Sequence, residues 1–173
     1  MRRLFLTTVL LLALAPVLGA QVPYDTARNQ GIGVGAGAAS GAGLFYQEIL
    51  RSGYGYRGAL ALWKKGDFSF VNVGASGLRV LTDDGRRRIW LVASAAYWRS
   101  SEEETEEEFD AAGNVVLERI FDDVDDTWAL GLGVGIELPL GDRVGLALEG
   151  VFTYWDDTGD LLPLPQIGVL YQF

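Results

Sequence analysis

The residue types that most often carry out chemistry in proteins are absent from this sequence. Its 173 residues include no cysteine and no histidine. This excludes thiolate nucleophiles, Cys-ligated zinc, Ser-His-Asp hydrolysis and His-based metal sites. A Ser–Lys pair is not expected either, because the only lysines, Lys64 and Lys65, are adjacent. We therefore predict a chain that is not an enzyme and binds no cofactor, and the net charge of −9 argues against nucleic acid as a partner.

Acidic residues are concentrated in one segment. Between Glu102 and Asp126 there are twelve acidic residues and a single basic one, Arg119, so this segment alone carries −11. Such a block repels itself and does not pack into a core. We predict a long, exposed acidic loop over 100–126. Carboxylates suit hard divalent cations, so weak cation binding there is one interpretation, and a solvated loop without a ligand is the other.

The N-terminus has the layout of a secretory signal. Arg2 and Arg3 precede an apolar run from Leu4 to Leu14, and small residues follow as far as Ala20. This pattern predicts a signal peptide over 1–20 and a mature domain over 21–173. A membrane-anchoring helix is the alternative, but the run is shorter than the ~20 residues that span a bilayer.

The mature chain shows a hydrophobic period of two. In the stretch 127–138, bulky apolar residues alternate with glycine, alanine and polar residues, which is the pattern of a β-strand with two different faces. Turn residues separate similar stretches. Residues 31–50 form either two strands or one, which would give seven strands in total. The predicted strands lie near 31–38, 43–50, 54–64, 68–81, 88–99, 127–138, 143–155 and 163–173.

The two faces indicate which side of the sheet points inward. A closed barrel of eight strands has an interior only wide enough for side chains, so the bulky face would overfill it. We therefore predict that the bulky face meets hydrocarbon and that the small face lines the interior. The fold class predicted is all-β, an eight-stranded antiparallel up-and-down transmembrane β-barrel. The alternative is a secreted soluble barrel that binds a ligand inside.

Charged residues on the predicted interior face are the main candidate site. We interpret them as a network of paired charges that fills a closed lumen, because a buried charge must be paired. The alternative is an ion path, which would make the protein a narrow pore or carrier for small or apolar solutes. The predicted interior charge network consists of Glu48, Arg57, Glu137, Arg143 and Glu149.

Aromatic residues cluster near the predicted strand ends. Two rings of aromatic side chains bracketing an apolar band are expected of membrane barrels. The predicted girdle contains Trp63, Trp98, Trp128 and Trp155 at the outer ends and Trp90 and Tyr171 at the inner ends.

The C-terminal segment, from Pro165 to Phe173, carries a family resemblance. Alternate residues are apolar or aromatic and the last is phenylalanine: Ile167, Val169, Tyr171 and Phe173. With the signal and the alternating strands, this ending resembles the small eight-stranded outer-membrane barrels of the OmpA/OmpX type. The resemblance implies an outer-membrane location, contact with outer-membrane lipid, and recognition of the last strand by the barrel-assembly machinery. We expect a non-enzymatic integral barrel with a structural or surface-interaction role.

Overall fold

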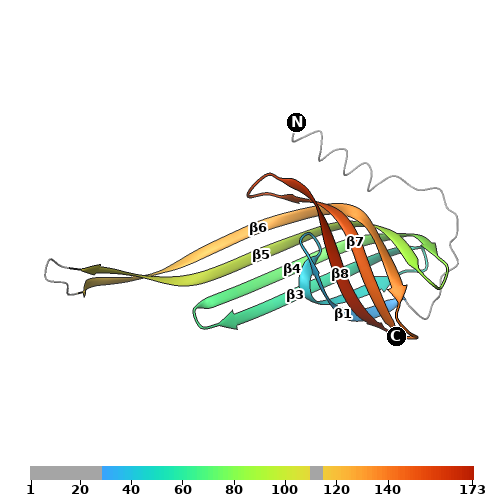
Figure 1. The fold of residues 1–173 in the computed structure, drawn as a ribbon, viewed down its shortest axis with the longest axis horizontal. Coiled ribbons are helices and arrows are strands. Elements are labelled where there is room, and N and C mark those ends of the chain that lie inside the picture. Colours follow the sequence, from blue (N-terminus) through green and yellow to red (C-terminus); the bar gives the residue numbers. More distant parts are fainter. Residues whose placement is uncertain (1–28, 110–114) are drawn as a thin grey trace.

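A computed structural model describes residues 29–109 and 115–173 of the chain, and these form a barrel of eight antiparallel strands (Figure 1). The predicted all-β fold with eight strands is confirmed, whereas the predicted signal over 1–20 lies outside the described residues. No helix long and apolar enough to cross a membrane occurs in the described ranges. The strands are β1 (Gln30–Gly37), β2 (Gly41–Ile49), β3 (Tyr54–Lys65), β4 (Phe68–Asp83), β5 (Arg88–Phe109), β6 (Val115–Pro139), β7 (Val144–Trp155) and β8 (Leu161–Gln172).

Pairing between the first and last strands closes the ring. Each strand pairs with its neighbour in sequence, and β1 then pairs with β8 in a register that places Gly31 opposite Gln172. The segment 31–50 forms two strands, because a three-residue turn reverses the chain before Gly41, whose φ is +87°. That left-handed conformation favours glycine. Closure leaves no open sheet edge within the ring itself.

Side chains alternate between the inside and the outside of the ring as expected. On β6, Leu130 and Val134 point outward and are 48% and 54% exposed, while Gly135 is buried. The interior is filled by a smaller set of side chains. Its fully buried apolar members include Ile49, Trp90, Val92, Val151 and Leu170.

The two ends of the barrel differ. We call the end where β1 begins and β8 finishes the termini end, and the opposite one the far end. At the far end the β3–β4 and β5–β6 hairpins extend beyond the other strands, and the β5–β6 hairpin forms a long ribbon (Figure 1). Pairing of β4 with β5 ends at Glu102, and pairing of β6 with β7 ends at Ala129. Beyond these points the ribbon has only two strands.

The acidic segment is part of this ribbon, so its prediction as a loop over 100–126 is wrong. Residues up to Phe109 continue β5 and residues from Val115 continue β6, with 110–114 outside the described residues. The register places acidic residues directly opposite one another, as in Glu103↔Asp122 and Glu107↔Glu118. Like charges in such positions are destabilising. The backbone pairing of β5 with β6 begins in the barrel, which sets its register, and it continues into the ribbon despite this repulsion.

The turn between β1 and β2 folds into the far end of the barrel. Ala39 is fully buried, and the indole nitrogen of Trp98 donates a hydrogen bond of 2.9 Å to the carbonyl of Ala38. Asn72 accepts a hydrogen bond from the backbone nitrogen of Ala42 at 2.6 Å. A glycine provides the space, because a Cβ at Gly74 would overlap the carbonyl group of Ser40. We call this turn, residues 38–40, the hairpin tip.

Substitution of Gly74 by alanine should displace the hairpin tip. The added methyl group would meet backbone atoms of Ser40 and Gly41, which cannot rotate away. We expect a loss of about 1–3 kcal/mol of unfolding free energy, typical of overpacking, measured by urea unfolding of the purified protein. Gly77→Ala on the same strand is the matched control, since nothing lies within 4 Å of its Cβ position. Equal unfolding midpoints for the two variants would contradict this account of the tip.

Candidate functional site

The centre of the lumen holds a buried ion pair. Arg57 of β3 and Glu149 of β7 lie on opposite walls, and Nη1 of the arginine is 2.9 Å from Oε1 of the glutamate. Their side chains are 7% and 1% exposed. The indole nitrogen of Trp90 donates to the same carboxylate oxygen at 3.0 Å. The guanidinium also lies 5.2 Å from the ring centroid of Phe45 and 5.8 Å from that of Trp90. The pair is therefore enclosed by aromatic rings.

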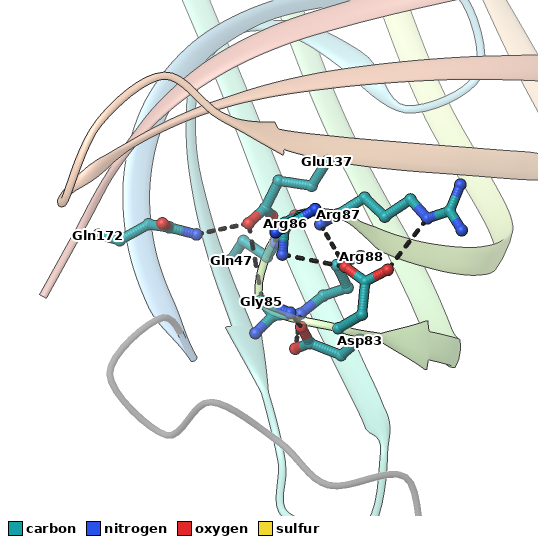
Figure 2. A network of polar contacts seen from close by, with 9 residues as sticks. Gln47, Asp83, Gly85, Arg86, Arg87, Arg88, Glu137 and Gln172 are labelled. Carbon is teal, nitrogen blue, oxygen red and sulfur yellow. Dashed lines mark hydrogen bonds and ion pairs between the residues drawn. The ribbon is translucent and has the colours of Figure 1, made fainter.

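Gln47 of β2 links this pair to a second carboxylate, Glu137. Its side-chain oxygen accepts hydrogen bonds from Nε and Nη2 of Arg57, at 3.0 and 2.7 Å. Its amide nitrogen donates to Glu137 Oε2 at 3.4 Å. The other oxygen of Glu137 accepts a hydrogen bond of 2.6 Å from Gln172, which closes the network at the termini end (Figure 2).

A second arginine completes the network at the termini end. Arg88 begins β5, and its Nη1 lies 3.8 Å from Glu137 Oε1. Its Nε donates to Asp83 at 2.8 Å, and both side chains of that pair are at most 5% exposed. In the adjoining turn, the backbone amides of Arg86 and Arg87 hold the pKa of Asp84 below its usual value (Figure 2). Five ionisable groups, three acidic and two basic, thus share the interior.

The structure places three of the five predicted charges in this network and two elsewhere. Arg57, Glu137 and Glu149 are interior. The assignment of Glu48 is wrong, because Phe45, Gln47 and Ile49 are the inward-facing residues of β2. Glu48 lies outside, near the termini end. There its carboxylate accepts hydrogen bonds from the side chains of three outward-facing residues: Gln30, Tyr46 and Tyr56.

Arg143 is also outside the lumen. It lies in the turn between β6 and β7, one residue before β7 begins, and its side chain is exposed. Its Nη1 donates a hydrogen bond of 2.9 Å to the hydroxyl of Tyr171, an outward-facing residue of β8. The predicted interior position of Arg143 is therefore wrong. The alternation of inward and outward residues in β7 does not extend into the turn that precedes it.

The predicted girdle is largely wrong. Trp90 is fully buried in the lumen, where Gly135 on the paired strand leaves room for the indole. Trp98 is on the same inward face of β5 and covers the hairpin tip. Trp128 and Tyr171 do face outward, at 52% and 46% exposure.

The other two predicted girdle tryptophans are also on the inward side of their strands. Alternation places Trp155 with the buried Val151 and Thr153, and its ring centroid is 6.3 Å from that of Trp98. Trp63 follows the inward-facing Ala59 and Ala61 but is 62% exposed, because β3 has by then passed the far end of the ring. The girdle prediction considers only whether an aromatic residue lies near a strand end. The direction of its side chain depends instead on the alternation of inward and outward residues along the strand.

Sequence reasoning missed four members of the network: Gln47, Asp83, Arg88 and Gln172. Two of them carried a usable signal. Arg88 lies an even number of residues from Trp90 and Val92, so it is on the same face of β5. Gln172 is likewise on the same small face of β8 as Gln166 and Gly168. Asp83 had no such signal, because the register between β4 and β5 shifts between Val80 and Thr82 and reverses the alternation.

A small cavity separates the ion pair from the hairpin tip. It is lined in part by Ser40, Phe45, Arg57, Glu149 and Gln166, and it has space for about one water molecule. Oε2 of Glu149 and both amide atoms of Gln166 are buried beside it without a hydrogen-bond partner in the described part of the chain. The cavity has both polar and apolar lining residues, and it is too small for an organic ligand.

Metal binding receives no support from the described residues. No group of three or more acidic side chains that could hold a metal ion occurs among them. The side chains of 103–122, which contain most of the predicted acidic cation site, lie outside the described residues. The weak binding of divalent cations by this segment therefore stays a prediction.

The comparisons with known proteins do not identify a family. No family model matches the chain, and none of the curated proteins matches it significantly.

Loss of Glu149 should destabilise the barrel strongly. The variant Glu149→Gln leaves the Arg57 charge buried without its carboxylate, and removal of one partner of a buried pair costs about 3–5 kcal/mol. The double variant Arg57→Met, Glu149→Met removes both charges and should recover much of that loss. Urea unfolding of the purified protein, followed by tryptophan fluorescence, measures the unfolding free energy of both variants. Glu48→Gln, at the outer surface, is the control for loss of one carboxylate. If Glu149→Gln costs no more than Glu48→Gln, the pair does not hold the lumen together.

Proposed function

We propose that this chain is an integral outer-membrane β-barrel without enzymatic activity. Its proposed role is structural, or an interaction at the cell surface through the acidic ribbon. The single observation that carries the proposal is the apolar outer face of the closed ring. Every strand of the barrel contributes large apolar side chains to that face.

The apolar outer face runs around the whole barrel. A soluble monomer rarely exposes a continuous apolar patch of more than a few hundred Å², and a band around an entire barrel is what lipid requires. Charged residues on this face lie toward its edges, with Glu48 and Arg79 at the termini end and Lys64 and Arg99 at the far end. Members exposed by 47% or more include Ile32, Val34, Leu44, Leu60, Leu62, Val73, Leu130, Val134, Phe152 and Ile167.

The filled lumen favours a structural role over transport. The Arg57–Glu149 pair and Trp90 occupy the centre, and the hairpin tip occupies the far end. The cavity between them has space for about one water molecule. A solute would have to displace a buried ion pair to pass, and breaking such a pair is costly.

The two ends of the barrel support the remaining parts of the proposal. The ribbon carries most of the negative charge of the chain away from the barrel, where a surface partner could reach it. Alternate residues from the middle of β8 to the C-terminus present an apolar face to the outside. Ile167, Val169, Tyr171 and Phe173 are each 41–58% exposed, so this face is accessible to the barrel-assembly machinery that we propose as a partner.

An arginine introduced into the apolar face should oppose insertion. Leu148 points outward on β7 and is 38% exposed. Arginine near the middle of a bilayer costs about 2–4 kcal/mol, so we expect Leu148→Arg to lower the amount of folded protein in outer-membrane fractions. Leu140→Arg is the matched control, because Leu140 lies in a turn and is 61% exposed. Recovery of the wild-type protein in a soluble fraction without detergent would overturn the proposal.

Single-channel recording separates the structural role from the pore. We expect the purified protein to insert into planar bilayers without steady conductance, because side chains fill its lumen. A wide porin inserted in the same bilayers is the positive control. Steady, reproducible conductance from the wild-type barrel would favour a narrow pore instead.

A further inference from the structure

Four tyrosines lie near the termini end of the barrel on the outer face of β2, β3 and β8. Tyr46, Tyr54, Tyr56 and Tyr171 are each between 36% and 50% exposed. A tyrosine has an apolar ring and a polar hydroxyl, so such residues gather where a hydrocarbon layer meets its polar headgroups. These tyrosines therefore mark the depth at which headgroups would lie on this side of the barrel.

One arginine is held at this depth by Tyr171. The side chain of Arg143 is exposed, and the described hydrogen bond to the Tyr171 hydroxyl uses its Nη1 alone. A guanidinium carries five N–H donors in a planar arrangement. Most of the donors of Arg143 thus remain available to a ligand that approaches from the outside.

A second arginine is held in the same region by Tyr54. Arg79 points outward from β4, and its guanidinium carbon lies 4.3 Å from the centroid of the Tyr54 ring. Its Nη1 donates a hydrogen bond of 2.8 Å to the carbonyl of Ser52, in the turn that joins β2 to β3. These contacts fix the orientation of the guanidinium, so less side-chain entropy is lost when it binds.

Neither arginine forms a salt bridge within the described residues, although the adjacent carboxylate of Asp142 acts electrostatically on Arg143. The ion pairs of the described residues involve Arg57, Arg87 and Arg88. A cationic group on a lipid-facing surface, without a salt bridge to the protein, is neutralised best by an anion at the headgroup level. The planar guanidinium matches two oxygens of a phosphate.

We propose that Arg79 with Tyr54, and Arg143 with Tyr171, bind the phosphate groups of glycerophospholipids in the leaflet at the termini end. Each pair presents guanidinium donors beside an aromatic ring that packs against the first carbons of the lipid. This inference rests on the proposed membrane location and goes further, because it assigns a lipid class and two binding sites.

The test compares lipid retention by the full chain and its variants. The protein is purified in a maltoside detergent, dioleoyl phosphatidylglycerol is added at increasing mole fraction, and bound lipids are counted by native mass spectrometry. Each of Arg79→Gln and Arg143→Gln should weaken the binding of one lipid about tenfold, because a hydrogen bond to a charged group is lost. The matched control is Lys64→Gln, Lys65→Gln, which removes two positive charges at the far end.

Three results would overturn the inference. The first is retention of phosphatidylglycerol by the double variant Arg79→Gln, Arg143→Gln at the wild-type level. The second is equal retention by the wild type of dioleoylglycerol, which has no phosphate. The third is displacement of the lipid by millimolar inorganic phosphate, which would indicate a site for free phosphate instead.

Heat-modifiable gel migration checks that each variant is folded. If the wild type partitions into membranes but the variants retain lipid normally, only this inference fails, and the proposed function stands.

Discussion

The narrow bore of an eight-stranded ring is the constraint on which the rest of the structure depends. Strand alternation sends every second residue inward, and the interior admits only a limited volume of side chains. Glycine and alanine occupy many inward positions, which leaves room for a few large groups such as Trp90 and Arg57. The bulky residues then occupy the outer face, so the same alternation that fills the lumen also produces the apolar surface.

Charges inside such a ring have to be satisfied by the ring itself. Glu137 and Glu149 each contact an arginine, and Gln47 joins the two halves of the network through both of its amide atoms. Buried ion pairs contribute little net stability compared with apolar packing. Their value here is geometric, since the contacts connect β2, β3, β5, β6, β7 and β8 across the lumen and define how the walls face one another.

Much of the fold could be predicted from the sequence, but the site could be predicted only in part. The strand positions and the outward orientation of Leu130 and Val134 follow from periodicity, which is a property of neighbouring residues. The placement of Arg143 and Trp98 depends on turns and on the hairpin tip, which bring distant residues together. Charge repulsion alone predicts a loop for the acidic segment. The ribbon forms because β5 and β6 are already paired in the barrel, and their backbone hydrogen bonds continue beyond it.

The two-stranded ribbon also has a consequence for neighbouring molecules. Beyond the barrel, both of its outer edges carry backbone groups that pair with no third strand of residues 29–109 and 115–173. Exposed edges invite pairing with another chain, and charged residues are a common protection against it. In the proposed membrane location, the ribbons of two barrels that lie side by side would carry the same sign and repel one another. The acidity would then keep adjacent molecules apart, and this separation would weaken as dissolved salt screens the charges.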